Sequence, residues 1–165
     1  MTWTCLSCGE VHEGLPLDFG FDEPAHWDGR RHDHDFLDAD LCSWTDDVGM
    51  RCYFVRGVLE IPVHELGERF AYGVWGSLSE ESFERVVARW EDPDRVDDPP
   101  YFSWLSNSIP GYPETLNLRA NVVTAALDLR PSITLLDDDH PLAVEQREGI
   151  SVARVEEIAG LLMHA

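Results

Sequence analysis

Two cysteines near the start of the chain have the spacing of a metal-binding turn. Cys5-x-x-Cys8-Gly9 places two thiols on a tight reversal, where both can bind one face of a tetrahedral ion. The glycine allows the reversal without a Cβ clash. His12 follows shortly after Cys8 and can supply a third ligand. The pattern predicts a zinc knuckle that includes Cys5, Cys8 and His12.

The two thiols also allow two interpretations other than zinc binding. Cys5 and Cys8 could be free thiols in a small core, since unliganded cysteine packs as a small hydrophobic residue. A redox CxxC pair is disfavoured, because such motifs usually open a helix after a strand and Gly9 disfavours a helix. The chain has four cysteines, and in a reducing compartment these are more often ligands or buried thiols than disulfides.

A second group of polar residues could carry catalysis. Asp139 could orient His140 as a general base, and Arg147 could bind a carboxylate or phosphate, with Glu145 close by in the sequence. This arrangement would make the protein a small hydrolase or transferase. The alternative is structural: Asp139 and His140 cap a helix while Glu145 and Arg147 form salt bridges. The sequence places no serine or thiol nucleophile beside His140, so it predicts no triad.

The segment around His32 and His34 allows a second metal site. The two histidines alternate with Asp33 and Asp35 in a polar stretch. A solvated loop is the favoured interpretation, because no further ligand lies nearby in the sequence.

The charge of the chain restricts its partners. It has 32 acidic and 12 basic residues, a formal net charge of −20, and every basic residue is an arginine. Such a field repels nucleic-acid phosphates and anionic lipid, so we expect no nucleic-acid or membrane binding. Two interpretations of the acidity remain open. One is general solubility or adaptation to salt. The other is a surface that binds a basic protein partner, as in an acidic, immunity-type inhibitor. The candidate contact is an acidic loop containing Glu91, Asp92, Asp94, Asp97 and Asp98.

The composition predicts one packed domain over residues 1–165. Hydrophobic residues make up 44% of the chain and aromatic residues 10%. A knuckle and polar-loop segment (1–45) is expected to pack on a core formed by residues 46–165. The chain has no apolar run of membrane-spanning length and no secretory signal at its start, which predicts a cytoplasmic protein.

The elements that must position these residues follow from residue periodicity. Alternating patterns predict strands over residues 50–63, 70–78, 101–106, 116–122 and 133–135. The capping-box spacing of Ser77 and Glu80 predicts a first helix, and two more are expected after His140 and Ser151. This order predicts an α+β fold: a mainly antiparallel sheet, two or three helices and an N-terminal zinc-knuckle-like hairpin.

Several segments, in order along nearly the whole chain, match a known pattern. They include Cys5-x-x-Cys8-Gly-x-x-His12, Asp40-Leu-Cys42, Phe54-Val-Arg56-Gly57, Gly73-Val-Trp75 and Pro110-Gly-Tyr-Pro113. In these segments the chain resembles the bacterial domain family DUF2199, a resemblance that implies no activity. The family pattern includes Cys42 and lacks Cys52. It therefore implies zinc bound by Cys5, Cys8, Cys42 and either His12 or another histidine, a closed structural site.

Overall fold

The computed structural model describes residues 1–164, and within this range the chain forms two β-sheets and three α-helices. The strands are β1 (Thr2–Thr4), β2 (Val11–Glu13), β3 (Asp18–Gly20), β4 (Phe36–Leu37), β5 (Leu41–Thr45), β6 (Arg51–Pro62), β7 (Arg69–Leu78), β8 (Tyr101–Trp104), β9 (Arg119–Val123) and β10 (Ser132–Leu135). The helices are α1 (Glu80–Ala88), α2 (Pro141–Glu148), α3 (Val152–Met163) and the short 3₁₀ helix η1 (Pro93–Asp97).

The long β6–β7 hairpin forms the centre of the larger sheet. Its antiparallel register runs without interruption from Tyr53↔Leu78 to Pro62↔Arg69. The strand order is β3-β7-β6-β10-β9-β8, with β5 paired to the first half of β6 and β4 paired to β5. Only the β3–β7 and β6–β10 pairs are parallel. The predicted α+β class with a mainly antiparallel sheet is confirmed.

The first 45 residues contribute to both sheets. β1 and β2 form a separate two-stranded sheet, whereas β3, β4 and β5 belong to the larger one. The first part of segment 1–45 is thus the hairpin, and its remainder supplies strands to the larger sheet.

Each face of the β6–β7 hairpin packs against different elements. One face carries Leu59 and Phe70, both fully buried, in the core that also contains residues of α1, α2 and α3. The opposite face carries Phe54 and Trp75, which form a second cluster with Cys42 and Trp44 of β5. Side chains alternate between faces along a strand, so a single pair of strands can supply both clusters.

The first helix begins two residues later than the capping box predicts. Ser77 still lies in β7, where its Oγ accepts a hydrogen bond from the Trp104 N–H. Ser79 is the N-cap instead, and its side chain accepts from the Ser82 N–H. Strand pairing up to Leu78 takes precedence over the local capping signal. The predicted cap of the last helix is confirmed, because the Ser151 side chain accepts from the Arg154 N–H.

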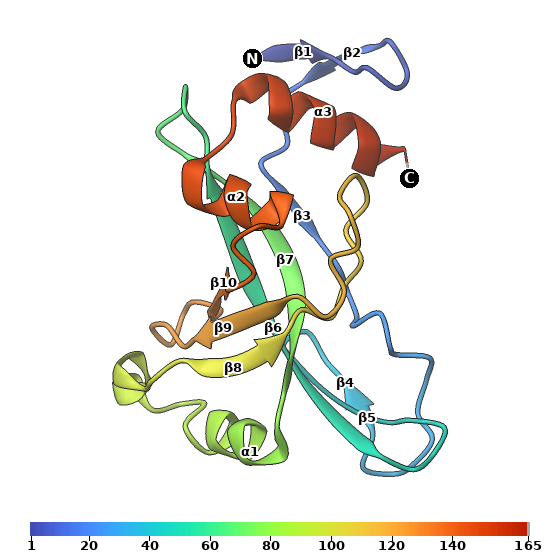
Figure 1. Ribbon diagram of the computed structural model, residues 1–165, viewed down its shortest axis with the longest axis vertical. Coiled ribbons are helices and arrows are strands. Elements are labelled where there is room, and N and C mark those ends of the chain that lie inside the picture. Colours follow the sequence, from blue (N-terminus) through green and yellow to red (C-terminus); the bar gives the residue numbers. More distant parts are fainter. Residues whose placement is uncertain (165) are drawn as a thin grey trace.

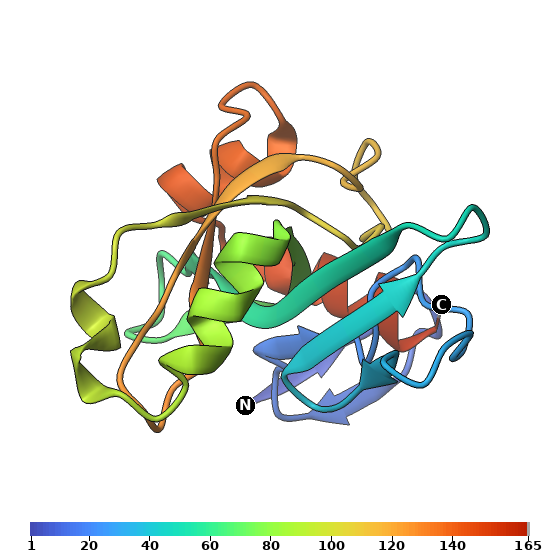
Figure 2. The same ribbon diagram turned by 90° about the horizontal axis from the view of Figure 1, so that it is seen from below.

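The two ends of the chain meet at one end of the molecule. Figure 1 shows the β1–β2 hairpin beside α3, with both termini nearby, while α1 lies at the far end of the β6–β7 hairpin. The view from below in Figure 2 places α1 in the foreground and the β1–β2 hairpin behind it. Every helix in the described range is too short or too polar to form a membrane span.

Candidate metal centre

The β1–β2 hairpin positions three of the predicted ligands. Its register pairs Trp3 with His12, and the two rings stack with centroids 5.1 Å apart. The turn is closed by hydrogen bonds from the Gly9 N–H to the Cys5 carbonyl and from the Cys5 N–H to the Glu10 carbonyl. Gly9 has φ +74°, a conformation that favours glycine. Cys5 and Cys8 thus lie in the turn, and His12 faces them from the returning strand.

Helix α3 packs directly against this turn. Trp3, Cys5 and Ala159 form a small buried cluster, and Ser7 Oγ donates a hydrogen bond to the Gly160 carbonyl at 2.9 Å. A Cβ at Gly160 would lie only 3.3 Å from Ser7 Oγ, so a glycine here permits the close approach. The helix ends at Met163 with His164 as its C-cap. Because α3 packs against the turn, His164 lies next to the cysteines.

Four donor atoms converge between the hairpin and α3. The ligand atoms of Cys5, Cys8, His12 and His164 all lie within 4.8 Å of one another. The Cys5 Sγ is 3.3 Å from His164 Nε2, and the Cys8 Sγ is 3.4 Å from His12 Nε2. Zinc–sulfur and zinc–nitrogen bonds of about 2.3 and 2.0 Å at tetrahedral angles require sulfur–nitrogen separations of about 3.5 Å. The group therefore fits a tetrahedral ion with two sulfur and two nitrogen ligands.

The environment of Cys5 favours its ionised form. A backbone hydrogen bond from Cys8 is the main influence on the thiol and outweighs the opposing effect of burial. Together with weaker hydrogen bonds from Ser7 and His164, it lowers the pKa of Cys5 to about 6. The thiolate is the form that binds metal, so the turn holds this sulfur in the state that a ligand requires.

Cys42, the remaining predicted ligand, lies outside the group formed by the other three and His164. It is fully buried in β5, opposite Phe54 of β6, in the cluster that contains Trp75. Burial raises the pKa of the Cys42 thiol to about 12, so it packs as a small hydrophobic side chain. Its β5 register directs it to this cluster, and His164 completes the group at the hairpin instead.

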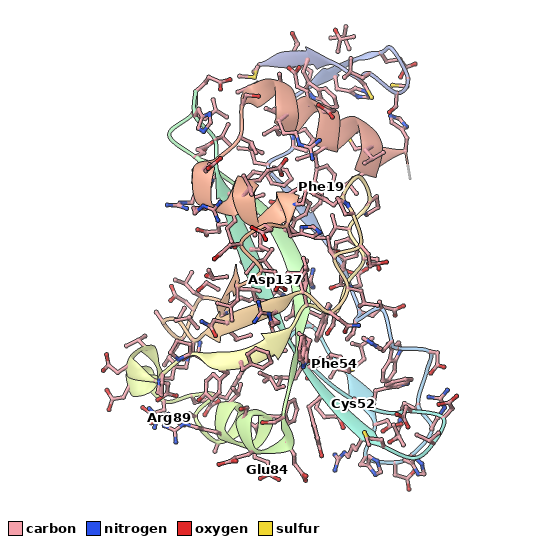
Figure 3. The ribbon with its side chains drawn as sticks, in the orientation of Figure 1. Phe19, Cys52, Phe54, Glu84, Arg89 and Asp137 are labelled. Carbon is pink, nitrogen blue, oxygen red and sulfur yellow. The ribbon has the colours of Figure 1, made fainter. Side chains whose placement is uncertain are left out.

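His164 was not singled out from the sequence. The only signal was a histidine just after an amphipathic helix, together with the open choice between His12 and another histidine. Cys52 also lies outside the group: Figure 3 shows it low on β6, at the opposite end of the molecule from the β1–β2 hairpin.

A protein-family model matches most of the chain. A family model described as an uncharacterized protein conserved in bacteria (DUF2199) matches residues 4–150. The chain belongs to this family. The match contains Cys5, Cys8 and His12 but stops before α3, so His164 lies outside it. Neither the curated proteins nor the solved structures gave a match.

The His32–His34 segment is an ordered loop organised by Asp35. The two imidazoles stack in parallel, with centroids 5.1 Å apart. The Asp35 carboxylate is buried and accepts hydrogen bonds from the Arg31 N–H, the His32 N–H and Thr45 Oγ1. Burial alone would raise the pKa of Asp35, but these hydrogen bonds outweigh it and lower the pKa to about 2. Within residues 1–164, the hairpin group is the one cluster of potential ligands able to hold a metal ion.

The four weak catalytic candidates do not converge on one site. His140 is the N-cap of α2: its Nδ1 accepts from the Leu142 N–H, and its Nε2 lies 3.0 Å from the Pro113 carbonyl. Glu145 instead accepts hydrogen bonds from Tyr112 and Arg154. Arg147 is paired only with Asp138, at 3.9 Å. Asp139 is exposed. These contacts agree with the structural alternative, in which His140 caps the helix and the charged residues form salt bridges.

The cap predicts a specific response to substitution. His140→Ala removes the acceptor for the Leu142 N–H and is expected to lower the free energy of unfolding by about 1 kcal/mol. His140→Asn keeps a capping acceptor and should retain most of this stability. Urea unfolding of both variants provides the measurement. Equal destabilisation by Ala and Asn would show that the contact with Pro113, rather than the cap, is the important one.

Proposed function

We propose that the chain is a binding or accessory module whose two ends are joined by a structural zinc ion. The observation that carries this proposal is the convergence of Cys5, Cys8, His12 and His164 within 4.8 Å. Four protein ligands fill a tetrahedral shell, which leaves no position for water or substrate. Two thiolates with two imidazoles form a donor set that suits zinc. The zinc would bind the hairpin to the end of α3.

Metal analysis of the purified protein tests this proposal. Protein prepared without chelator should contain about one zinc per chain. Cys5→Ser, Cys8→Ser and His164→Ala should each reduce retention strongly, because each opens the shell. Cys42→Ala and Cys52→Ser are matched controls that should keep the metal. Full zinc content in the Cys5/Cys8 double variant, or zinc loss in the Cys42 variant alone, would contradict the assignment.

We further propose a basic protein as the partner, as expected for an acidic inhibitor of the immunity type. The net charge of −20 supports this proposal. In the structure, some carboxylates of the acidic loop form ion pairs and others are exposed and unpaired within residues 1–164. Asp98 is buried and binds Arg85 and Arg89, and Asp92 also pairs with Arg89. Glu91, Asp94 and Asp97 are exposed and form no ion pair within residues 1–164; these three are the proposed contacts.

The charge dependence of association tests the partner proposal. Binding of a basic protein captured from lysate should be fast at low salt and slow as ionic strength rises, because ions screen the attraction. Replacing Glu91, Asp94 and Asp97 by their amides should reduce the association rate more than the dissociation rate. The same charge change at the exposed Asp22, Asp47 and Glu68 is the control. Association that is indifferent to salt would count against this partner class.

A further inference from the structure

Strands β6 and β10 separate after one paired position. They are parallel neighbours at Ser132↔Val58, after which β10 follows β9 and β6 follows β7. Beyond this point the side-chain amide of Gln146, from α2, replaces a neighbouring strand. Its Oε1 accepts from the Leu135 N–H and its Nε2 donates to the Ile133 carbonyl, both at 2.9 Å. The sheet is therefore open between β6 and β10 where Gln146 of α2 binds β10.

The edge of β6 at this opening has unused backbone hydrogen-bonding groups. The Val58 N–H donates to Pro131 and the Pro62 carbonyl accepts from Ile150, so both residues direct these groups away from β7. Backbone groups alternate in direction along a strand, and Glu60 lies between these two residues with the same parity. Its N–H and carbonyl therefore point into the opening, where no strand within residues 1–164 pairs with them.

The opening forms a pocket of about 450 Å³. The half-buried Val58 supplies apolar surface above the core residues Ile133 and Ala143, while Arg69 of β7 and Arg147 of α2 supply two guanidinium groups from different elements. A concave, partly apolar site with a few convergent polar groups is typical of small-molecule binding. Glu60 and Asp138 also line the pocket, so its lining has no formal net charge, in a chain whose net charge is −20.

Both arginines are only loosely engaged within the chain. Arg69 Nε lies 3.7 Å from the Glu60 carboxylate, and Arg147 Nη1 lies 3.9 Å from the Asp138 carboxylate and 3.5 Å from the Asp138 carbonyl. By contrast, Arg89 approaches Asp98 to 2.7 Å. The side chains of Arg69 and Arg147 are 59% and 52% exposed, and solvated pairs of this kind contribute little to stability. Their hydrogen-bond donors can therefore turn to a ligand at small cost.

We propose that this pocket binds a small organic monocarboxylate. The carboxylate would accept hydrogen bonds from Arg69 and Arg147, and the apolar part of the ligand would lie against Val58. A guanidinium matches the planar geometry of a carboxylate. Glu60 and Asp138 also line the pocket and would repel a doubly charged phosphate more strongly than a single charge. No lining residue belongs to the metal group, so the two sites can be tested separately.

The test is an NMR titration of the full-length protein with benzoate, hexanoate and N-acetylglycine. At least one carboxylate should shift the backbone amides of Ser132, Thr134 and Gln146. Arg147→Gln and Arg69→Gln should each weaken that binding about tenfold or more, since each removes a charge-assisted hydrogen bond. Arg30→Gln, an exposed arginine in a distant loop, is the control and should bind like the unchanged protein. Zinc content should stay the same in all three variants.

Comparing benzoate with benzamide and phenylphosphonate tests whether the pocket recognises a carboxylate. Benzamide, the neutral counterpart of benzoate, should bind at least about tenfold more weakly if the carboxylate is recognised. Equal binding of benzamide, tighter binding of phenylphosphonate, or no amide shift with any of the three carboxylates at millimolar concentration would overturn the proposal. If one arginine variant fails to fold, the other still tests the prediction, because the two side chains come from different elements.

Discussion

Removing zinc is expected to release the β1–β2 hairpin and the end of α3 while the larger sheet stays folded. The hairpin has only three residue pairs, and two short strands are marginally stable alone in water. Its contacts with α3 are the small cluster of Trp3, Cys5 and Ala159 and the Ser7–Gly160 hydrogen bond, to which the proposed zinc ion would add. The β6–β7 core has no ligand in the group and should retain its structure.

Hydrogen exchange with and without chelator measures this effect directly. Amide protection should fall in residues 2–13 and in the last turn of α3, and it should persist in β6 and β7. Free zinc at a thousandfold excess over its dissociation constant stabilises the folded state by about 4 kcal/mol. For a domain of this size, its loss would lower the thermal midpoint by roughly 8–16 °C.

The histidine variants provide the matched comparison. His164→Ala should reproduce the effect of chelator, because it removes one of the four ligands. His32→Ala changes a histidine outside the group and should leave both protection and midpoint unchanged. Chelator that leaves the hairpin fully protected would contradict a stabilising metal, and an equal response of the two variants would contradict the role of His164.

Arg95→Met is expected to have the largest destabilising effect of any arginine substitution. Arg95 is 5% exposed and lies in η1. Its guanidinium donates hydrogen bonds to the backbone carbonyls of Trp90, Ala125, Ala126 and Leu129. Methionine preserves much of the side-chain volume but leaves these carbonyls without their donors. A buried acceptor that loses its donor costs about 1–3 kcal/mol, and here four carbonyls lose the same donor group.

Urea unfolding should separate this network from ordinary surface charge. Arg130→Met is the control, because Arg130 is exposed and pairs with Asp40 at 2.9 Å. An exposed ion pair contributes about 0–1 kcal/mol, so the control should change stability little. Comparable losses in the two variants would show that the carbonyls near Arg95 find other donors, such as water, when the guanidinium is removed.

Local patterns in the sequence determined a substantial part of this protein. The Cys5-x-x-Cys8-Gly9 spacing and His12 predicted a hairpin that presents three donor atoms, and the structure contains it. Apolar alternation predicted β6 and β7, and Ser151 marked the start of the last helix. These features depend on residues a few positions apart, whose geometry is set by turn and strand conformation. Sequence periodicity therefore suffices to identify them.

Only the tertiary structure shows that His164 supplies the fourth donor atom and that Cys42 lies in the second core cluster. Cys5 and His164 are 159 positions apart, and their approach depends on the docking of α3 at Gly160. Cys42 lies nearer to the knuckle in the sequence, yet the β5–β6 register places it against Phe54 in the second core cluster. The pocket beside α2 likewise exists because Gln146 takes the place of a strand. Such contacts depend on how whole elements pack, which no local spacing of residues encodes.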